Sequence, residues 1–229
     1  MKTIGLLGGM SWESSIGYYR AINEGVKDAL GGLHSAKIAM YSVDFDAIEK
    51  LQHSGDWEGT AQILSEAAIN VQHAGADCLL ICTNTMHKVA PQIQQAITIP
   101  LLHIADATAE VVVKKGFKTV GLLGTAFTME QDFYKGRLKD NYGLTVLVPD
   151  EADRKIVHDV IYNELCLGRS MPSSKSEFLR IITALADQGA EVVILGCTEI
   201  GMLVEQSDTE VTLLDTTTIH ARKAVQWAI

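Results

Sequence analysis

The chain has 229 residues, and 47% of them are hydrophobic, which is enough to bury a core in one large domain or two small ones. Its formal net charge of −9, without any Lys/Arg-rich run that carries interleaved aromatic residues, argues against nucleic acid or an anionic membrane as a partner. No segment approaches the roughly 18 uninterrupted apolar residues of a membrane span, and the apolar part of the N-terminus is too short for a signal peptide, so we expect a cytoplasmic protein.

The first part of the chain alternates short apolar segments with amphipathic ones. The pattern predicts strands at 3–7, 37–43, 77–82 and 100–104, and helices at 13–30, 57–74 and 87–96. Ser11 is a candidate N-cap of the first helix, and Gly31-Gly32 is a stop signal for it. Asp44 and Asp46 are expected in a turn.

The rest of the chain repeats this alternation. It predicts strands at 118–123, 144–148, 191–195 and 211–214, and helices at 129–140, 151–166, 173–188 and 217–229. Apolar strands separated by amphipathic helices indicate parallel sheets covered by helices on both faces. We therefore predict an α/β fold of two pseudo-symmetric lobes, 1–115 and 116–215, with a C-terminal helix in 216–229 that packs on the first lobe.

Two internal repeats support the two lobes. The segment KTIGLLGG at 2–9 recurs as KTVGLLGT at 118–125, and GADCLLICTNT at 75–85 recurs as GAEVVILGCTE at 189–199. The two repeats have nearly the same separation along the chain, which is unlikely to arise by chance. The chain is therefore interpreted as two related halves, each of about the usual size of a small domain.

The second repeat aligns Thr83 with Cys197 and places a polar cluster after a strand in each half. Parallel sheets bind ligands beyond the carboxyl ends of their strands, so we expect an active site in a cleft between the lobes. If the halves are related by an approximate two-fold axis, Thr83 and Cys197 approach a small substrate from opposite sides. Inversion at a carbon requires two proton-handling groups on opposite faces of that carbon.

Other polar or loop residues near these strand ends are candidates for substrate binding. With nearby backbone N–H groups, Asn84, Thr85 and Thr198 suit a carboxylate and the enolate-like charge that develops when an α-proton leaves. The full set of these candidates is Met10, Ser11, Asn84, Thr85, Thr125 and Thr198. The glycine loop after the first strand is not a dinucleotide-binding motif, because G-x-G-x-x-G is absent.

Cys78, Cys82 and Cys166 are interpreted as buried apolar residues. Because neighbouring side chains of a strand point to opposite faces, we expect Cys82 in the sheet core and Thr83 at the cleft. Cys197 ends a strand, where backbone N–H groups are expected to favour its thiolate. We predict no metal site, since the chain has no Cys-x-x-Cys or His-Glu-x-x-His motif and its histidines are scattered.

Five segments run in order through almost the whole chain: GLLGGMSWES (5–14), TNTMH (83–87), VGLLGT (120–125), IYNEL (161–165) and ILGCTEI (194–200). In these segments and their order, the sequence resembles a known family, the cofactor-independent aspartate/glutamate racemases. The resemblance implies two α/β lobes, a homodimer, and racemisation of an amino acid by a pair of cysteines. It also implies that neither pyridoxal phosphate nor another cofactor takes part.

One departure concerns the catalytic pair. Where this family commonly reads Cys-Asn-Thr, the chain reads Thr83-Asn84-Thr85, and Cys82 comes one position too early. We therefore expect Cys197 to abstract the α-proton of the L-amino acid and Thr83 to deliver a proton to the other face. A threonine hydroxyl is a very weak acid, so its alkoxide is hard to form and Thr83 is a poor base for the D-isomer. The L-to-D direction is therefore expected to be faster.

A second departure concerns the substrate. Aspartate-specific relatives hold the distal carboxylate with basic side chains, one of them a Lys near the IYxEL segment, whereas this chain continues Leu165-Cys166-Leu167-Gly168 before Arg169. In the first half, the comparable region offers Gln52 for substrate binding instead of an arginine. Aspartate or glutamate is the family-level expectation, and a neutral polar amino acid such as homoserine is the alternative.

His87 and Glu199 are predicted to support the site. His87 is expected to orient its loop or to cap a helix. Glu199 is expected either to make a hydrogen bond near Cys197 or to be an ordinary acidic residue at a helix N-terminus. Rival functions of the same architecture are a hydantoin racemase, a maleate isomerase or an arylmalonate decarboxylase. A non-catalytic two-lobed protein that binds a small ligand is a further alternative.

Overall fold

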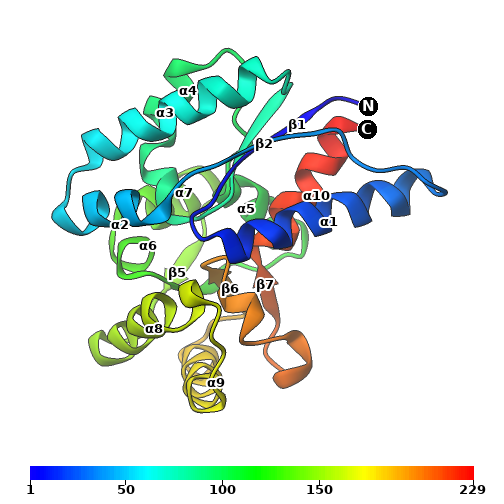
Figure 1. Ribbon diagram of the computed structural model, residues 1–229. Helices are drawn as coiled ribbons and strands as arrows, with labels where there is room; N and C mark the ends of the chain where they lie inside the picture. The colour runs from blue at the N-terminus through cyan, green and yellow to red at the C-terminus, as the bar shows by residue number, and fades with distance from the viewer. The chain divides into compact units, whose positions relative to one another are not determined.

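The computed structural model describes residues 1–229, and its chain divides into two compact units (Figure 1). Unit 1 comprises Met1–Ile104 and His220–Ile229, and unit 2 comprises Ala105–Ile219. The lobe boundaries at 1–115 and 116–215 stay a prediction. No helix of either unit combines the length and the apolar character needed to cross a membrane.

Unit 1 is built on a three-stranded parallel sheet with the order β2-β1-β3. Its strands are β1 (Ile4–Gly8), β2 (Ile38–Ser42) and β3 (Cys78–Ile81). Its helices are α1 (Trp12–Leu30), α2 (Phe45–Ser54), α3 (Trp57–His73), η1 (Thr85–Val89), α4 (Ala90–Ala96) and most of α10 (Thr216–Ala228).

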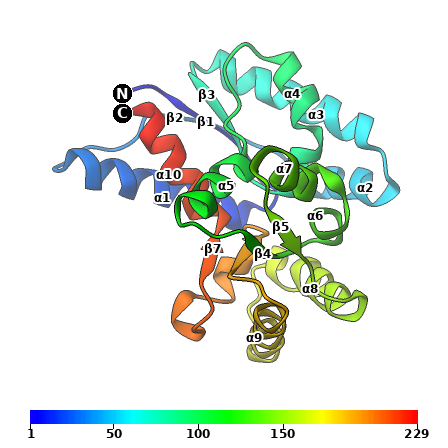
Figure 2. The same ribbon diagram turned by 180° about the vertical axis from the view of Figure 1, so that it is seen from behind.

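The two faces of the unit 1 sheet bury alternate residues of its strands. Cys78, Leu80 and Cys82 pack in one apolar cluster with α1 and α10, whereas Leu79 and Ile81 pack in another with α3 and α4. Figures 1 and 2 show these helix pairs on opposite sides of the strands. The predicted burial of Cys82 in the core is therefore confirmed, and it follows from the two-residue period of a strand.

Unit 2 is built on a four-stranded parallel sheet with the order β5-β4-β6-β7. Its strands are β4 (Thr119–Gly124), β5 (Thr145–Leu147), β6 (Val192–Gly196) and β7 (Leu213–Asp215). Helices α8 (Glu151–Asn163) and α9 (Pro172–Asp187) cover one face, and α5 (Ile104–Lys114) and α7 (Asp132–Tyr142) lie on the other side (Figure 2). The shorter helices are α6 (Ala126–Glu130), η2 (Leu165–Leu167), η3 (Ile200–Met202) and η4 (Gln206–Asp208).

The sequence repeat corresponds to a repeat in strand pairing. In unit 1, Leu7 of β1 lies opposite Ile81 of β3, and in unit 2, Leu123 of β4 lies opposite Leu195 of β6. The repeat aligns these residues with one another, so the two pairs of strands have the same register. The predicted fold class of two parallel α/β sheets flanked by helices is confirmed.

Several element predictions were wrong in extent. Instead of a strand at 100–104, the structure has a single bridge between Leu79 and Leu101, and Ile104 already begins α5. The predicted helix 129–140 is two helices, α6 and α7, because the backbone is extended at Gln131. Helices α2 and α5 were missed, and Asp44 is the N-cap of α2, where its side chain accepts the Asp46 N–H.

Candidate functional site

In unit 1, the candidate residues follow two neighbouring parallel strands. The Cys82 N–H donates to the Leu7 carbonyl (2.9 Å), which holds the loop after β3 beside the loop after β1. Gly9 has a φ of 94°, and a Cβ at this position would lie 2.4 Å from the Val43 carbonyl oxygen. Only glycine fits such a conformation at this distance, so the glycine loop is a local requirement of the fold.

Met10 and Ser11 are buried in the turn between β1 and α1. Ser11 is at the N-cap of α1, as predicted, and its carbonyl accepts the Ser14 and Ser15 hydroxyls at 3.2 and 2.9 Å. The Ser15 Oγ also accepts the Gly9 N–H at 2.8 Å. Ser15 therefore fastens the glycine loop to the helix. The sequence reasoning missed this role, although the Ser-rich start of α1 is visible in the sequence.

Thr83 and Asn84 lie between β3 and η1, Thr85 begins η1, and all three are buried. Thr83 is the most accessible of the three, with 9% of its surface exposed. Its neighbour Cys82 is fully buried, and burial raises the pKa of that thiol far above its usual range. Cys82 is therefore an inert apolar residue in this structure, and Thr83 is the residue of the pair that solvent reaches.

His87 supports the Thr83 loop through both of its ring nitrogens. Its Nδ1 lies 2.8 Å from the Thr83 carbonyl, which can only accept a hydrogen bond, and its Nε2 lies 3.2 Å from the Ile104 N–H, which can only donate. These bonds require the neutral imidazole with its proton on Nδ1. Both ring nitrogens are therefore engaged within unit 1, one of them with the backbone of the Thr83 loop.

Gln52 lies in the last turn of α2 and is 1% exposed. Helix α2 follows β2, so it begins at the same carboxyl edge of the unit 1 sheet as the other two loops. The structure therefore assigns Gln52 to a buried position in unit 1. Its predicted contact with the substrate stays a prediction.

In unit 2, Cys197 is the first residue after β6, and it is 7% exposed. Its Sγ donates to Glu199 Oε2 (3.0 Å), and the same oxygen accepts the Thr198 hydroxyl (2.9 Å). Cys197, Thr198 and Glu199 are thus brought together by hydrogen bonds, and the supporting hydrogen bond predicted for Glu199 is present.

The surroundings of Cys197 favour the thiol, which corrects the expectation of a thiolate. Burial, followed by the charges of Glu199 and Cys166, raises the pKa of the Cys197 thiol well above its ordinary value. The sequence suggested backbone N–H groups as the dominant influence, but desolvation and a neighbouring carboxylate outweigh them. Cys197 therefore carries its proton until something in the site takes it.

Thr125 follows β4, in the position that corresponds to the loop after β1. Its Oγ1 accepts the Thr128 N–H at 3.3 Å and caps α6. The next N–H, of Ala126, donates to His158 Nδ1 at 3.1 Å. The loop that carries Thr125 is therefore fixed to both α6 and α8.

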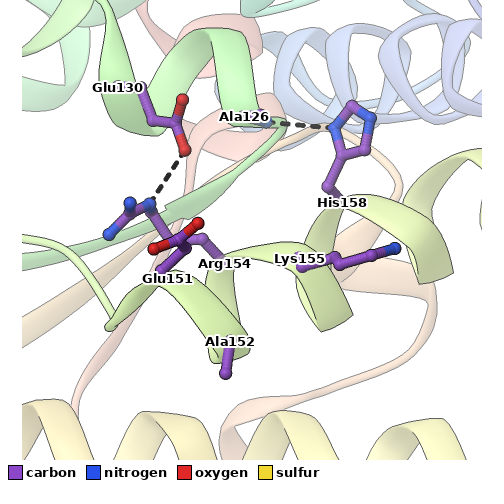
Figure 3. Close-up of a pocket in the computed structure, with 7 residues that line it drawn as sticks. All are labelled: Ala126, Glu130, Glu151, Ala152, Arg154, Lys155 and His158. Carbon is purple, nitrogen blue, oxygen red and sulfur yellow. Dashed lines mark hydrogen bonds and ion pairs between the residues drawn. The ribbon is translucent and has the colours of Figure 1, made fainter.

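A pocket of about 540 Å³ opens between α6 and α8. Figure 3 shows His158 turned toward the Ala126 N–H and Arg154 turned toward Glu130, with which it forms a 2.9 Å ion pair. None of the predicted site residues lines this pocket, and its cations Arg154 and Lys155 are already paired, with Glu130 and Asp159. No group of three or more His, Cys, Asp or Glu side chains is placed to hold a metal ion in the structure.

Comparison with known proteins gives consistent similarities. The model of the family described as Asp/Glu/Hydantoin racemase matches residues 7–224. The chain is similar to a broad-specificity amino-acid racemase of Bacillus subtilis (strain 168), with 24% identity over 173 residues, which are 74% of this chain and 73% of that protein.

Two crystal structures are similar over the whole chain. One is a protein from Yersinia pestis described as a candidate Asp/Glu racemase, with 55% identity and a TM-score of 0.91, and the match covers 100% of this chain and 99% of that one. The other is an aspartate racemase homologue from Pyrococcus horikoshii OT3, with 34% identity, a TM-score of 0.85 and the same coverage of both chains.

Proposed function

The chain belongs to the Asp/Glu/Hydantoin racemase family and is a racemase, and from this premise we propose that it inverts the α-carbon of an amino acid by a two-base mechanism. In this proposal Cys197 serves one face of the substrate and Thr83 serves the other, without a cofactor. The proposal requires the loops after β3 and β6 to meet at one substrate molecule.

The equivalence of the two strand ends is the observation that carries this proposal. β3 pairs with β1 in the register in which β6 pairs with β4, and the repeat aligns Thr83 with Cys197. Each residue is therefore presented by its own sheet in the same way. Two equivalent presentations related by an approximate two-fold axis would place one group on each face of a carbon, as inversion requires.

Removal of the α-proton from the L-amino acid is assigned to Cys197. The resting thiol first gives its proton to the Glu199 carboxylate, 3.0 Å away, which forms a thiolate without changing the net charge of the pair. The substrate's ammonium group favours the thiolate electrostatically. The thiolate then takes the α-proton, and Cys197 becomes a thiol again.

Delivery of a proton to the opposite face is assigned to Thr83. Its hydroxyl, directly or through one water, protonates the planar intermediate and yields the D-amino acid. The proton held by Glu199 must then return to the Thr83 side through solvent before the next turnover. In the reverse direction Thr83 would have to act as the base. Its alkoxide is hard to form, so turnover of the saturated enzyme is slower from the D-isomer.

The remaining candidate residues are assigned to substrate binding. Asn84, Thr85 and Thr198 supply amide and hydroxyl groups for the α-carboxylate and for the charge that spreads onto it after proton removal. Thr125 and the Met10-Ser11 turn complete the loops at the two strand ends.

The family description favours aspartate or glutamate as the substrate. A neutral polar amino acid such as homoserine is the second candidate, and a specific observation favours it. None of the candidate binding residues is a cation, Gln52 is a neutral amide, and Arg169, beyond η2, is exposed. A distal carboxylate would lack a matching positive charge among these residues.

Incubation of each common L-amino acid with the protein in deuterated water, without added cofactor, tests the proposal. We expect deuterium at the α-carbon, seen by NMR, together with the D-enantiomer, seen by chiral chromatography. Lack of exchange with every amino acid, while a hydantoin is racemised, would transfer the activity to the hydantoin branch of the family.

Substitution of Cys197 by serine provides the matched control. A racemase should lose turnover by on the order of 100-fold or more, because a hydroxyl replaces the thiol that removes the proton. A protein that only binds its ligand should keep its ligand affinity and show no exchange in either form. Unchanged turnover in Cys197→Ser would contradict the assignment of this thiol.

A further inference from the structure

The chain passes between unit 1 and unit 2 at two places, after Ile104 and before His220. Within unit 1 these two segments are joined directly, because His220 Nε2 donates to the Leu102 carbonyl at 2.7 Å. His220 Nδ1 in turn accepts the Tyr18 hydroxyl at 2.9 Å, so the imidazole is held from both sides. Both chain crossings are thus fixed to α1 by one buried histidine.

His87 connects this assembly to the Thr83 loop. Its Nε2 accepts the Ile104 N–H at the first crossing, and its Nδ1 donates to the Thr83 carbonyl. Its ring centroid lies 4.4 Å from that of His103 and 5.9 Å from that of His220. One side chain therefore links the proposed proton donor's backbone to the segment through which the chain leaves unit 1.

In the second half of the chain, the backbone carbonyl of the proposed catalytic residue is held differently. The Cys197 carbonyl accepts the Ile200 backbone N–H at 3.1 Å, so a helical turn suffices to hold it. The position that the repeat aligns with His87 is Gly201, which has no side chain that could make such a link. The link from the catalytic loop to a chain crossing is therefore a feature of the Thr83 half alone.

We propose that His87 is a positioning residue. By holding the Thr83 loop, it sets the position of the Thr83 hydroxyl relative to Ile104, where the chain leaves unit 1. The inference rests on the proposed function, because it matters only if Thr83 delivers the proton. Fixing the Thr83 carbonyl fixes the peptide plane that follows Thr83, and with it the direction of the side chain. A misplacement of about 1 Å at a reacting group can cost on the order of 100-fold in rate.

Two substitutions separate the two bonds of His87. In His87→Asn the amide nitrogen takes the place of Nδ1, so the bond to the Thr83 carbonyl can persist while the bond to Ile104 is lost. In His87→Gln the amide oxygen takes the place of Nε2, so the bond to Ile104 can persist while the bond to Thr83 is lost. The two variants test which of the two hydrogen bonds affects proton delivery, and both keep a polar side chain at position 87.

The readout is a ratio measured in one sample. The L-substrate is incubated in deuterated water, and D-product formation is divided by deuterium uptake into the remaining L-substrate. Deuterium uptake with retention reports on Cys197, whereas D-product requires Thr83. Because both rates come from the same molecules, the ratio does not depend on how much of a variant is folded.

We expect His87→Gln to lower this ratio by on the order of 10- to 100-fold, and His87→Asn to lower it less. Tyr18→Phe is the matched control, since it removes a hydrogen bond from the same histidine assembly without touching the Thr83 loop. It should leave the ratio at the wild-type value. A ratio unchanged in both His87 variants, or lowered equally by Tyr18→Phe, would overturn the proposal.

Exchange by the wild-type protein tests the proposed function, and the ratio in the His87 variants tests the role of His87 separately. If the wild-type protein shows no exchange with any amino acid, the two-base proposal is wrong and the role of His87 is wrong with it. If the wild-type protein racemises and the His87 variants keep its ratio, only the role of His87 is wrong. A nitrogen NMR spectrum gives an independent check, because the neutral ring with its proton on Nδ1 has a distinct pair of shifts.

Discussion

The thiol of Cys197 donates a 3.0 Å hydrogen bond to the Glu199 carboxylate, two residues further along the chain. The same carboxylate oxygen also accepts the Thr198 hydroxyl. This arrangement has two opposite effects on the thiol. It stabilises the protonated form, and in the proposed mechanism it also supplies the group that accepts the thiol proton.

Replacement of Glu199 by glutamine separates these effects through the pH profile. The Glu199 carboxylate helps to raise the pKa of the Cys197 thiol, so its neutral amide should lower that pKa. Exchange at the α-carbon of the L-substrate needs the thiolate and rises with pH in both proteins. The rise should therefore occur at lower pH in Glu199→Gln.

Initial exchange rates of the L-substrate, measured across pH 6 to about 10, check this expectation. Thr198→Val is the control, because it removes the second donor to the carboxylate while the carboxylate charge remains. A Glu199→Gln profile that moves to higher pH would show that the carboxylate does not hold the proton on the thiol.

Replacement of Thr83 by cysteine should reduce the difference between the two directions. A thiol is a far stronger acid than an aliphatic hydroxyl, so its thiolate can serve as the base for the D-isomer. We expect turnover of the saturated enzyme from the D-isomer to rise by on the order of tenfold. The values of kcat/KM must stay equal in the two directions, because the equilibrium constant of racemisation is one.

Turnover from each pure enantiomer at saturating concentration measures this change. Cys82→Ala is the matched control, since Cys82 is adjacent in sequence and fully buried in the core. It should cost about 1 kcal/mol or more of stability and leave the ratio of the two turnover rates unchanged. A loss of activity in Cys82→Ala without unfolding would return the catalytic role to Cys82.

Gly9→Ala should destabilise unit 1 more than an ordinary glycine substitution does. Gly9 has a positive φ, and the added Cβ would meet the Val43 carbonyl oxygen at 2.4 Å. Gly55 also has a positive φ, of 79°, but nothing lies within 4 Å of its missing Cβ. Gly55→Ala should therefore cost about 1–2 kcal/mol, and Gly9→Ala clearly more.

Urea denaturation of the two variants at one pH gives the comparison. Gly9→Ala should lose more unfolding free energy than Gly55→Ala if two features require glycine at position 9. These are the positive φ and the close approach of the Val43 backbone. Equal losses of unfolding free energy in both variants would mean that the loop moves aside at no cost.

Protonation of His220 should weaken the fold as the pH falls. Burial lowers its pKa to about 4, against about 6.5 for the exposed side chain. The unfolded chain therefore binds a proton at mildly acidic pH that the folded chain does not. The stability that His220 contributes is complete above about pH 6.5, and about 2 kcal/mol of it is lost between pH 7 and pH 5.

The unfolding free energy of the wild-type protein and of His220→Gln, measured at both pH values, tests this loss. Glutamine can keep the bond to the Leu102 carbonyl but does not titrate. The decrease from pH 7 to pH 5 should be smaller in the variant by about 2 kcal/mol. The same decrease in both proteins would assign the pH dependence to the carboxylates instead.

The repeat and the strand period predicted the parts of the structure that depend on local pattern. They gave both parallel sheets and the burial of Cys82, because a strand's two-residue period is visible in any apolar run. Helix α2 was missed because only Ile48 and Gln52 of its residues are fully buried, which leaves a weak periodic signal. The apolar run at 100–104 predicted a strand, but its pairing with β3 ends after a single bridge.

The state of the site residues depends on partners that a linear pattern does not identify. The proton on His87 Nδ1 is fixed by the Ile104 N–H, which lies 17 residues further along the chain. The raised pKa of Cys197 depends first on burial, which follows from the packing of the whole unit. Sequence reasoning could name these residues, but it could not assign their protonation.

The matched registers of β1–β3 and β4–β6 have a consequence for how a direction preference can arise. Two separate, identical half-chains that associated around a symmetry axis would have to present the same side chain from both strands. A single covalent chain with two copies is free of that requirement, since each copy can mutate alone. A duplicated and fused chain can therefore carry an oxygen at position 83 and a sulfur at the equivalent position 197, which two identical half-chains could not.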